Sequence, residues 1–175
     1  MKTLKIIVVG PYQAGKSTFI KTAKGIGAVD GANNAYNDSD VKQLSTVATD
    51  FEKILIDQDM MLYLFGMAGQ QRFDFMWDLI EDNAHGFIIL FDNTRPETFG
   101  ETRKMIDLVC AKTHAPYIVV GTSDDADLAW QPDDLRKALN LSQQLKLLNC
   151  SVEDITSVKK VILELLYEIL NKYEG

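Results

Sequence analysis

The chain of 175 residues is 46% apolar and 25% charged, and its formal net charge is −7. This length and balance predict one globular domain spanning residues 1–175. No apolar stretch approaches the roughly 18 residues that a membrane span needs, and no signal peptide precedes the first apolar run, so we expect a cytoplasmic protein. An isoelectric point near 4.8 without any basic run leaves nucleic acid outside the expected partners. Two isolated cysteines and two histidines supply neither a disulfide framework nor a zinc site.

Short, continuously apolar runs predict the strands of a mostly parallel sheet. Three of these runs are typical of a central strand that is buried on both faces: residues 6–9, 86–91 and 117–120. Each run ends in a polar loop, which indicates a helical crossover to the next strand. Residues 51–56 and 60–65 differ, because a short polar link joins them and predicts one antiparallel hairpin. Residues 146–148 predict a sixth and last strand.

Helices fill the intervals between these strands. The clearest runs from Val158 to Leu170, where apolar residues recur at the helical spacing and charged residues face away. Thr94 and Glu97 have the spacing of a capping box and predict a helix start. A short helix follows Pro132. The expected fold is therefore an α/β domain with six strands, one antiparallel hairpin and helices on both faces.

Residues 25–45 contain three glycines, several Asn and Asp residues, and few large apolar ones. Such a segment buries too little surface to order itself, so we expect a mobile loop or one that a ligand orders. Gly25 and Gly27 narrowly miss the dinucleotide fingerprint G-x-G-x-x-G, and they do not directly follow a predicted strand. A dinucleotide site is therefore not expected here.

The strongest motif follows the first strand. Residues 10–17, GPYQAGKS, match the phosphate-binding pattern G-x-x-x-x-G-K-[ST] between a strand and a helix. Gly15 lets successive backbone N–H groups face one anion, and the helix adds its positive end. Lys16 then reaches the β- and γ-phosphates, and Ser17 offers its hydroxyl to Mg²⁺. The alternative is an ordinary glycine turn whose helix is capped by Ser17.

Four downstream segments, taken in chain order, resemble the Ras-like small GTPases. Residues 46–51, TVATDF, are similar to the T-[IV]-G-x-D-F switch I, and residues 66–73, GMAGQQRF, resemble the D-x-x-G-Q-E-R-F switch II. Residues 122–125, TSDD, stand where the family has N-K-x-D, and residues 150–152, CSV, where it has C-S-A. The GP opening of the phosphate loop and the LFGxxGQ form of switch II favour prokaryotic small GTPases related to the gliding-motility and polarity switches.

The resemblance implies a small G-domain that binds GTP and GDP with Mg²⁺. Gln70 would orient the attacking water, and Lys16 would act with it in catalysis. Ser17 and Thr46 would hold the metal. The residues implied to bind the nucleotide are Gln13, Ala14, Gly15, Lys16, Ser17, Thr18, Thr46, Gly69, Thr122, Asp125, Ser151 and Val152. Asp125 can accept the two N–H groups on the Watson–Crick edge of guanine, which favours guanine over adenine.

The chain also departs from the family pattern. Gly66 replaces the switch II aspartate that reaches Mg²⁺ through water, so that support is missing or comes from another carboxylate. Thr122 and Ser123 replace Asn and Lys, which removes the amide that braces the phosphate loop. Tyr12 is bulky near the γ-phosphate position, and Arg72 is the candidate internal arginine finger. We therefore expect slow hydrolysis that needs an activating partner.

Regulatory and effector proteins are expected to bind through the switch segments. Phe73, Met76 and Trp77 could form part of such a surface, although core packing is the simpler interpretation. We expect no lipid anchor at either end, and a monomer or weak dimer. Two alternatives stay open: a guanine-nucleotide-binding scaffold with little or no hydrolysis, and a small P-loop kinase, which the scarcity of arginine disfavours.

Overall fold

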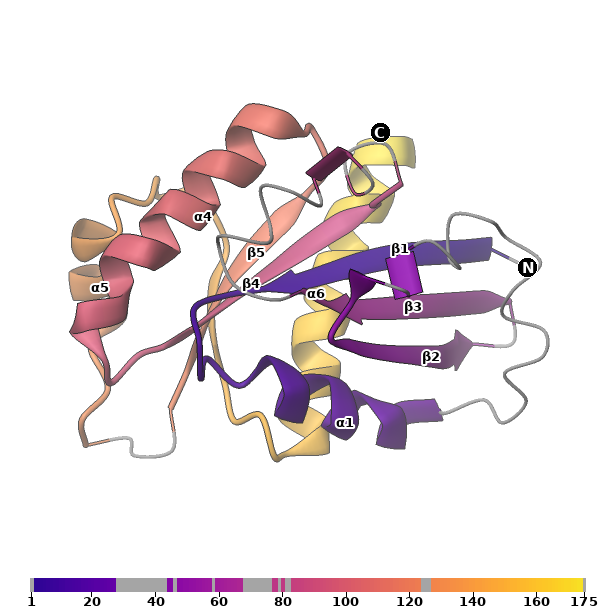
Figure 1. Ribbon diagram of the computed structural model, residues 1–175, viewed down its shortest axis with the longest axis horizontal. Helices are drawn as coiled ribbons and strands as arrows, with labels where there is room; N and C mark the ends of the chain where they lie inside the picture. The colour runs from indigo at the N-terminus through magenta and orange to yellow at the C-terminus, as the bar shows by residue number, and fades with distance from the viewer. Residues whose placement is uncertain are drawn as a thin grey trace.

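The computed structural model describes residues 2–27, 44–45, 47–57, 59–67, 77–78, 80, 83–123 and 127–174. Within these ranges, six strands form one sheet in the order β2-β3-β1-β4-β5-β6 (Figure 1). The strands are β1 (Lys2–Val9), β2 (Asp50–Asp57), β3 (Met60–Gly66), β4 (Gly86–Asp92), β5 (Tyr117–Thr122) and β6 (Leu147–Cys150). The helices are α1 (Lys16–Gly27), the 3₁₀ turn η2 (Pro96–Thr98), α4 (Phe99–Lys112), α5 (Pro132–Ala138) and α6 (Ile155–Glu174).

The sheet is parallel except at one edge. β1 pairs in parallel with both β3 and β4, and β5 and β6 extend the parallel part. β2 and β3 form the predicted antiparallel hairpin, in which Asp50 lies opposite Gly66. The small G-domain α/β fold expected from the sequence is therefore confirmed. The last strand begins one residue later than predicted, and Asp57 belongs to β2 and not to the connecting link.

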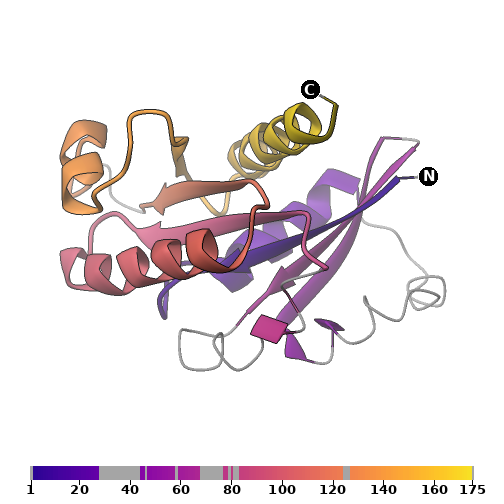
Figure 2. The same ribbon diagram turned by 90° about the horizontal axis from the view of Figure 1, so that it is seen from above.

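Two hydrophobic cores lie on opposite faces of the sheet. Ile6 and Val8 of β1 pack on the face that α1 and α6 cover, and Ile7 and Val9 pack on the face of α4 and α5. All four side chains are essentially buried. Figure 2 shows α4 on one side of the sheet and α6 on the other. Burial on both faces explains why this strand is continuously apolar and not alternating.

The predicted capping box at Thr94 is wrong. The Thr94 hydroxyl and N–H both donate to the carboxylate of Asp92, at 2.6 and 2.9 Å. η2 follows, and α4 begins only at Phe99, with no side-chain hydrogen bond at its N-cap. A preceding carboxylate thus competes for the hydroxyl that the capping box would use.

The segment expected to lack structure from residue 25 begins later than predicted, because α1 continues to Gly27. A Cβ at Gly25 would lie 2.6 Å from Ile155 Cδ1, and a Cβ at Gly27 would lie 2.3 Å from the carbonyl oxygen of Leu55. These glycines therefore let the last turn of α1 pack closely against α6 and β2. Residues 28–43 lie outside the described ranges, so the expectation of a mobile loop there stays a prediction.

The topology brings the ends of several strands to one edge. The loops that follow β1, β4, β5 and β6 all leave from the carboxyl ends of parallel strands. In open α/β sheets this edge is where ligands bind. In the described part of the chain, no helix is long and apolar enough to cross a membrane.

Candidate nucleotide site

The phosphate loop connects β1 to α1 and has the backbone of an anion site. Gln13 and Gly15 have positive φ angles of 64° and 97°, in the left-handed region that favours glycine. The N–H of Ala14 donates to the carbonyl of Pro11 at 3.1 Å, and the N–H of Phe19 donates to Gly15 at 2.8 Å. Left-handed residues directly before a helix N-terminus create a concavity of N–H groups that attracts negative charge.

Lys16 folds back over the loop that precedes it. Its ammonium donates to the carbonyl of Gly10 and lies 3.4 Å from the carbonyl of Pro11. Burial lowers the pKa of Lys16 from its ordinary value, while the carboxylates of Glu101 and Asp50 act in the opposite direction. A bound phosphate would add negative charge beside this ammonium and would favour its charged form.

Ser17 contacts the beginning of β2. Its hydroxyl donates to Asp50 Oδ2 at 2.8 Å, and the hydroxyl of Thr49 lies 3.1 Å from the same oxygen. The N–H of Thr49 donates to the carbonyl of Gly66 at 2.8 Å, which fixes this corner to the end of β3. The predicted switch I segment includes Asp50, but sequence reasoning assigned this residue no role at the site. The available signal was the hairpin, because its register places Asp50 opposite Gly66, the position at which the family has the switch II aspartate.

A cleft of about 600 Å³ covers this corner and the phosphate loop. It is lined by Tyr12, Gln13, Ala14, Gly15, Lys16, Ser17, Thr18, Thr49, Val152 and Glu153. The structure thus brings Val152, from the loop after β6, to the six predicted residues 13–18. Tyr12, which also lines this cleft, is 82% exposed.

Thr122 braces the phosphate loop. Its buried hydroxyl lies 2.9 Å from the carbonyl oxygen of Ala14 and 3.1 Å from that of Phe91, and it can donate to either. Replacement of the family's Asn removes the amide, as expected, but it does not leave the loop without a brace. A hydroxyl at the end of β5 provides it.

We expect Thr122→Val to lower the free energy of unfolding by about 1–3 kcal/mol, because it keeps the volume and removes the hydroxyl from two buried carbonyl groups. Denaturant unfolding measures this loss. Thr122→Ser is the matched control, since it keeps the donor and removes only a methyl group, and it should cost less. A valine variant that is as stable as the wild type would show that the hydroxyl braces nothing.

A second cavity, of about 340 Å³, lies at the ends of β4, β5 and β6. Ser123 and Ser151 line it together with Asn93 and Trp130. Asn93 Oδ1 accepts the N–H of Trp130 at 2.9 Å, so an asparagine that sequence reasoning missed holds the wall of this cavity. Ser151 therefore lies at this cavity, whereas its neighbour Val152 lines the cleft at the phosphate loop.

Several predicted site residues lie outside the described ranges, and their roles stay predictions. These residues are Thr46, Gly69, Gln70, Arg72 and Asp125. Of the predicted partner surface, Trp77 is 3% exposed and its ring stacks on Phe87, with the centroids 5.7 Å apart. Core packing is thus confirmed for Trp77, while Phe73 and Met76 lie outside the described ranges.

Arg95 lies beside the phosphate loop, and sequence reasoning assigned it no role there. Its guanidinium donates to Gln13 Oε1 at 2.8 Å and lies 3.5 Å from a carboxylate oxygen of Asp92. The guanidinium is thus bound to two side chains of the protein, and it links Gln13 of the phosphate loop to Asp92 at the end of β4.

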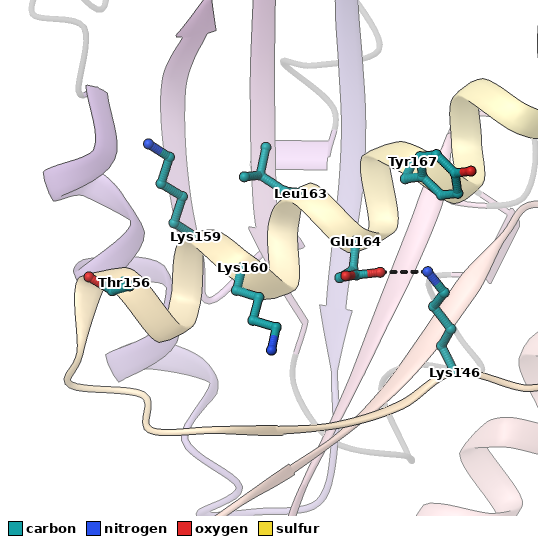
Figure 3. Close-up of a pocket in the computed structure, with 7 residues that line it drawn as sticks. All are labelled: Lys146, Thr156, Lys159, Lys160, Leu163, Glu164 and Tyr167. Atoms are coloured by element: carbon teal, nitrogen blue, oxygen red, sulfur yellow. Dashed lines mark hydrogen bonds and ion pairs between the residues drawn. The ribbon is translucent and has the colours of Figure 1, made fainter.

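A hollow of about 640 Å³ on α6 is separate from this site (Figure 3). Lys146 crosses to α6 there, with its ammonium 2.5 Å from Glu164 and 3.2 Å from Glu168. The same ammonium lies 5.2 Å from the ring centroid of Tyr167. None of the residues that line the hollow belongs to the phosphate loop, and the ion pairs tie the start of β6 to α6.

The phosphate loop between β1 and α1, together with the order of the strands, places the chain in the class of nucleotide-binding P-loop proteins with a small G-domain fold. The sequence profile described as "Ras: Ras family" matches residues 5–171, which is nearly the whole chain. The chain therefore belongs to the Ras family and is, by family membership, a GTP-binding switch protein. Members of this family are GTPases that bind guanine nucleotide and Mg²⁺.

Several curated relatives cover almost all of the chain. It is 28% identical to the Ras-related protein Rab-32C of Dictyostelium discoideum, over 98% of this chain and 75% of that protein. It is 26% identical to the Ras-related protein RIC1 of Oryza sativa subsp. japonica, over 96% and 81%, and 26% identical to the Ras-related protein RABD1 of Arabidopsis thaliana, over 96% and 80%. These relatives are eukaryotic, so the expected similarity to the prokaryotic motility switches is not supported.

Proposed function

We propose that this chain binds GTP and GDP with Mg²⁺, hydrolyses GTP slowly, and signals to protein partners through its two switch segments. One observation carries the proposal: a single cleft joins the phosphate loop, the Lys16 ammonium and the hydroxyls of Ser17 and Thr49. That cleft combines N–H donors, a cation and hard oxygen ligands, which are the groups that a nucleotide phosphate with its Mg²⁺ requires.

Residues 13–18 would hold the phosphates through their N–H groups, with Lys16 on the terminal ones. The hydroxyl of Ser17 would reach Mg²⁺, and Thr46 would complete the metal site in the triphosphate state. When bound, Mg²⁺ neutralises charge on the phosphate oxygens. Asp125 would select guanine, and Ser151 and Val152 would flank the base from the loop after β6. Gly69 would approach the γ-phosphate, and Gln70 would orient the water.

A scaffold that holds guanine nucleotide without turnover is the second candidate. The exposed Tyr12 at the mouth of the cleft and the glycine at position 66 favour it, because both depart from residues that support hydrolysis in the family. Product analysis of bound GTP over hours separates the two, since a scaffold releases no phosphate.

Switching should appear as a nucleotide-dependent change in hydrogen exchange. We expect residues 28–50 and 66–75 to exchange more slowly when a non-hydrolysable GTP analogue replaces GDP, because Thr46 and Gly69 gain the γ-phosphate as a partner. Mass spectrometry of peptic peptides measures this protection, and α6, remote from the cleft, serves as the internal control. Identical exchange of both segments in the two states would rule out a switch of this kind.

A further inference from the structure

We infer that Asp50, on β2, supplies the carboxylate that supports Mg²⁺ beside Ser17, in place of the switch II aspartate that this chain lacks at Gly66. The inference rests on the proposed function, because it concerns the metal that accompanies the nucleotide. It identifies a metal-supporting residue on the opposite strand of the hairpin.

Positions 50 and 66 are neighbours in the structure. Asp50 and Gly66 are register partners in the antiparallel pair of β2 and β3. A Cβ built on Gly66 would lie 3.3 Å from Asp50 Oδ2 and 3.3 Å from Asp50 Cβ. The Asp50 carboxylate therefore lies in the space that a side chain starting from position 66 would enter.

The space beside Gly66 also borders α1. The Cβ at Gly66 would also lie 2.8 Å from Ile20 Cδ1, in the first turns of α1. A side chain at position 66 would therefore have to shift the end of the buried Ile20 side chain, and it would crowd the Asp50 side chain. A glycine here leaves room for the Asp50 side chain to lie against the N-terminus of α1.

The hydrogen bonds orient Ser17 as a metal ligand. The Ser17 hydroxyl donates its proton to Asp50 Oδ2 at 2.8 Å, which leaves the oxygen lone pairs free to face the cleft. Hydrogen bonds of this kind orient the groups that bind a metal and raise their basicity. Thr49, whose hydroxyl lies 3.1 Å from the same Asp50 oxygen, also contacts the Gly66 carbonyl and so fixes the carboxylate to the hairpin.

Charge supports the same assignment. The Asp50 carboxylate interacts electrostatically with the Lys16 ammonium, so this corner holds one negative and one positive side chain beside the Ser17 hydroxyl. Across the described ranges, no group of three or more His, Cys, Asp or Glu side chains could hold a metal ion by itself. A single carboxylate beside a hydroxyl suits Mg²⁺, which keeps several waters and uses few protein ligands together with substrate phosphates.

The test measures how Mg²⁺ slows the release of a fluorescent GDP analogue. Wild type, Asp50→Asn and Glu52→Gln are loaded with the analogue, and the release rate is followed as free Mg²⁺ is varied and again in excess EDTA. Asn keeps the shape and an acceptor for Ser17 while it removes the charge. Glu52→Gln removes the same charge two residues along β2, on the same face of the strand. Asp50→Ser provides a second uncharged variant, and thermal unfolding in EDTA checks that each variant is folded.

We expect Asp50→Asn and Asp50→Ser to need about 10- to 100-fold more Mg²⁺ to retain the nucleotide, which is typical for the loss of a group that supports a metal ligand. Glu52→Gln should stay within about twofold of the wild type. Release in EDTA should be similar in all four proteins, because Asp50 acts on the metal. An unchanged Mg²⁺ requirement in folded Asp50 variants would overturn the inference. If the wild type binds no GDP at all, the proposed function itself fails.

Discussion

The protein should bind GDP more tightly than ADP by a factor on the order of 10⁴, which is the discrimination expected when the wrong ligand leaves buried polar groups unpaired. The Asp125 carboxylate would accept two N–H groups on the Watson–Crick edge of guanine, whereas adenine presents an acceptor there. Asp125→Asn should lose most of the GDP affinity and gain xanthosine diphosphate binding, because xanthine has a carbonyl where guanine has an amine. Equilibrium titration of nucleotide-free protein measures all three dissociation constants.

Asp127→Asn is the matched control for that experiment. It removes the same charge two residues along the same loop and should change the GDP dissociation constant by less than about twofold. Equal affinities of the wild type for GDP and ADP would contradict base recognition by Asp125. A variant that loses GDP without gaining the xanthosine nucleotide would contradict the assigned hydrogen bonds.

Hydrolysis of GTP should be slow, on the order of 10⁻⁴ to 10⁻² s⁻¹ in a single turnover without a partner. Gln70 is expected to orient the water, but the sequence has no arginine between Gly25 and Asp50 that could join Lys16 in neutralising the charge on the γ-phosphate. An arginine in that role is worth about 10³ to 10⁵ in rate. Gln70→Leu should slow the reaction further and leave GDP affinity nearly unchanged, because the side chain acts on the water.

Two arginine variants locate any internal finger. Arg72→Ala should change the rate little if an activating partner supplies the arginine, and a loss of about 10²-fold or more would identify Arg72 as the finger. Arg95→Ala should also have little effect, since Gln13 and Asp92 already occupy its guanidinium. Fast hydrolysis in all three variants, with Gln70, Arg72 or Arg95 substituted, would contradict this mechanism.

The strands were predictable because local patterns determine them. A strand buried on both faces must be continuously apolar, and β1, β4 and β5 show that pattern in the sequence and that burial in the structure. The phosphate loop was equally predictable, since its glycine and lysine stand at fixed offsets between a strand and a helix. The capping box failed because Asp92, two residues before Thr94, takes the hydroxyl.

The contacts that sequence reasoning missed join distant segments. Asp50 reaches Ser17 across 33 positions of sequence, and Thr122 reaches Ala14 across 108. Neither contact has a local periodicity, so motif matching recorded only that the family's residues were absent at positions 66 and 122. The register of the hairpin and the parallel order of the strands decide which side chains replace them.

The most direct test of the central claim is to identify the nucleotide that the purified protein retains. Wild type and Lys16→Ala are purified in Mg²⁺, denatured, and the released small molecules are identified and counted by mass spectrometry. Truncation of one partner of a buried charge pair typically costs about 2–5 kcal/mol, so Lys16→Ala should lose the ligand. We predict guanine nucleotide, close to one per chain, on the wild type and little on the variant. An adenine nucleotide on the wild type, or equal amounts of nucleotide on both proteins, would contradict the account.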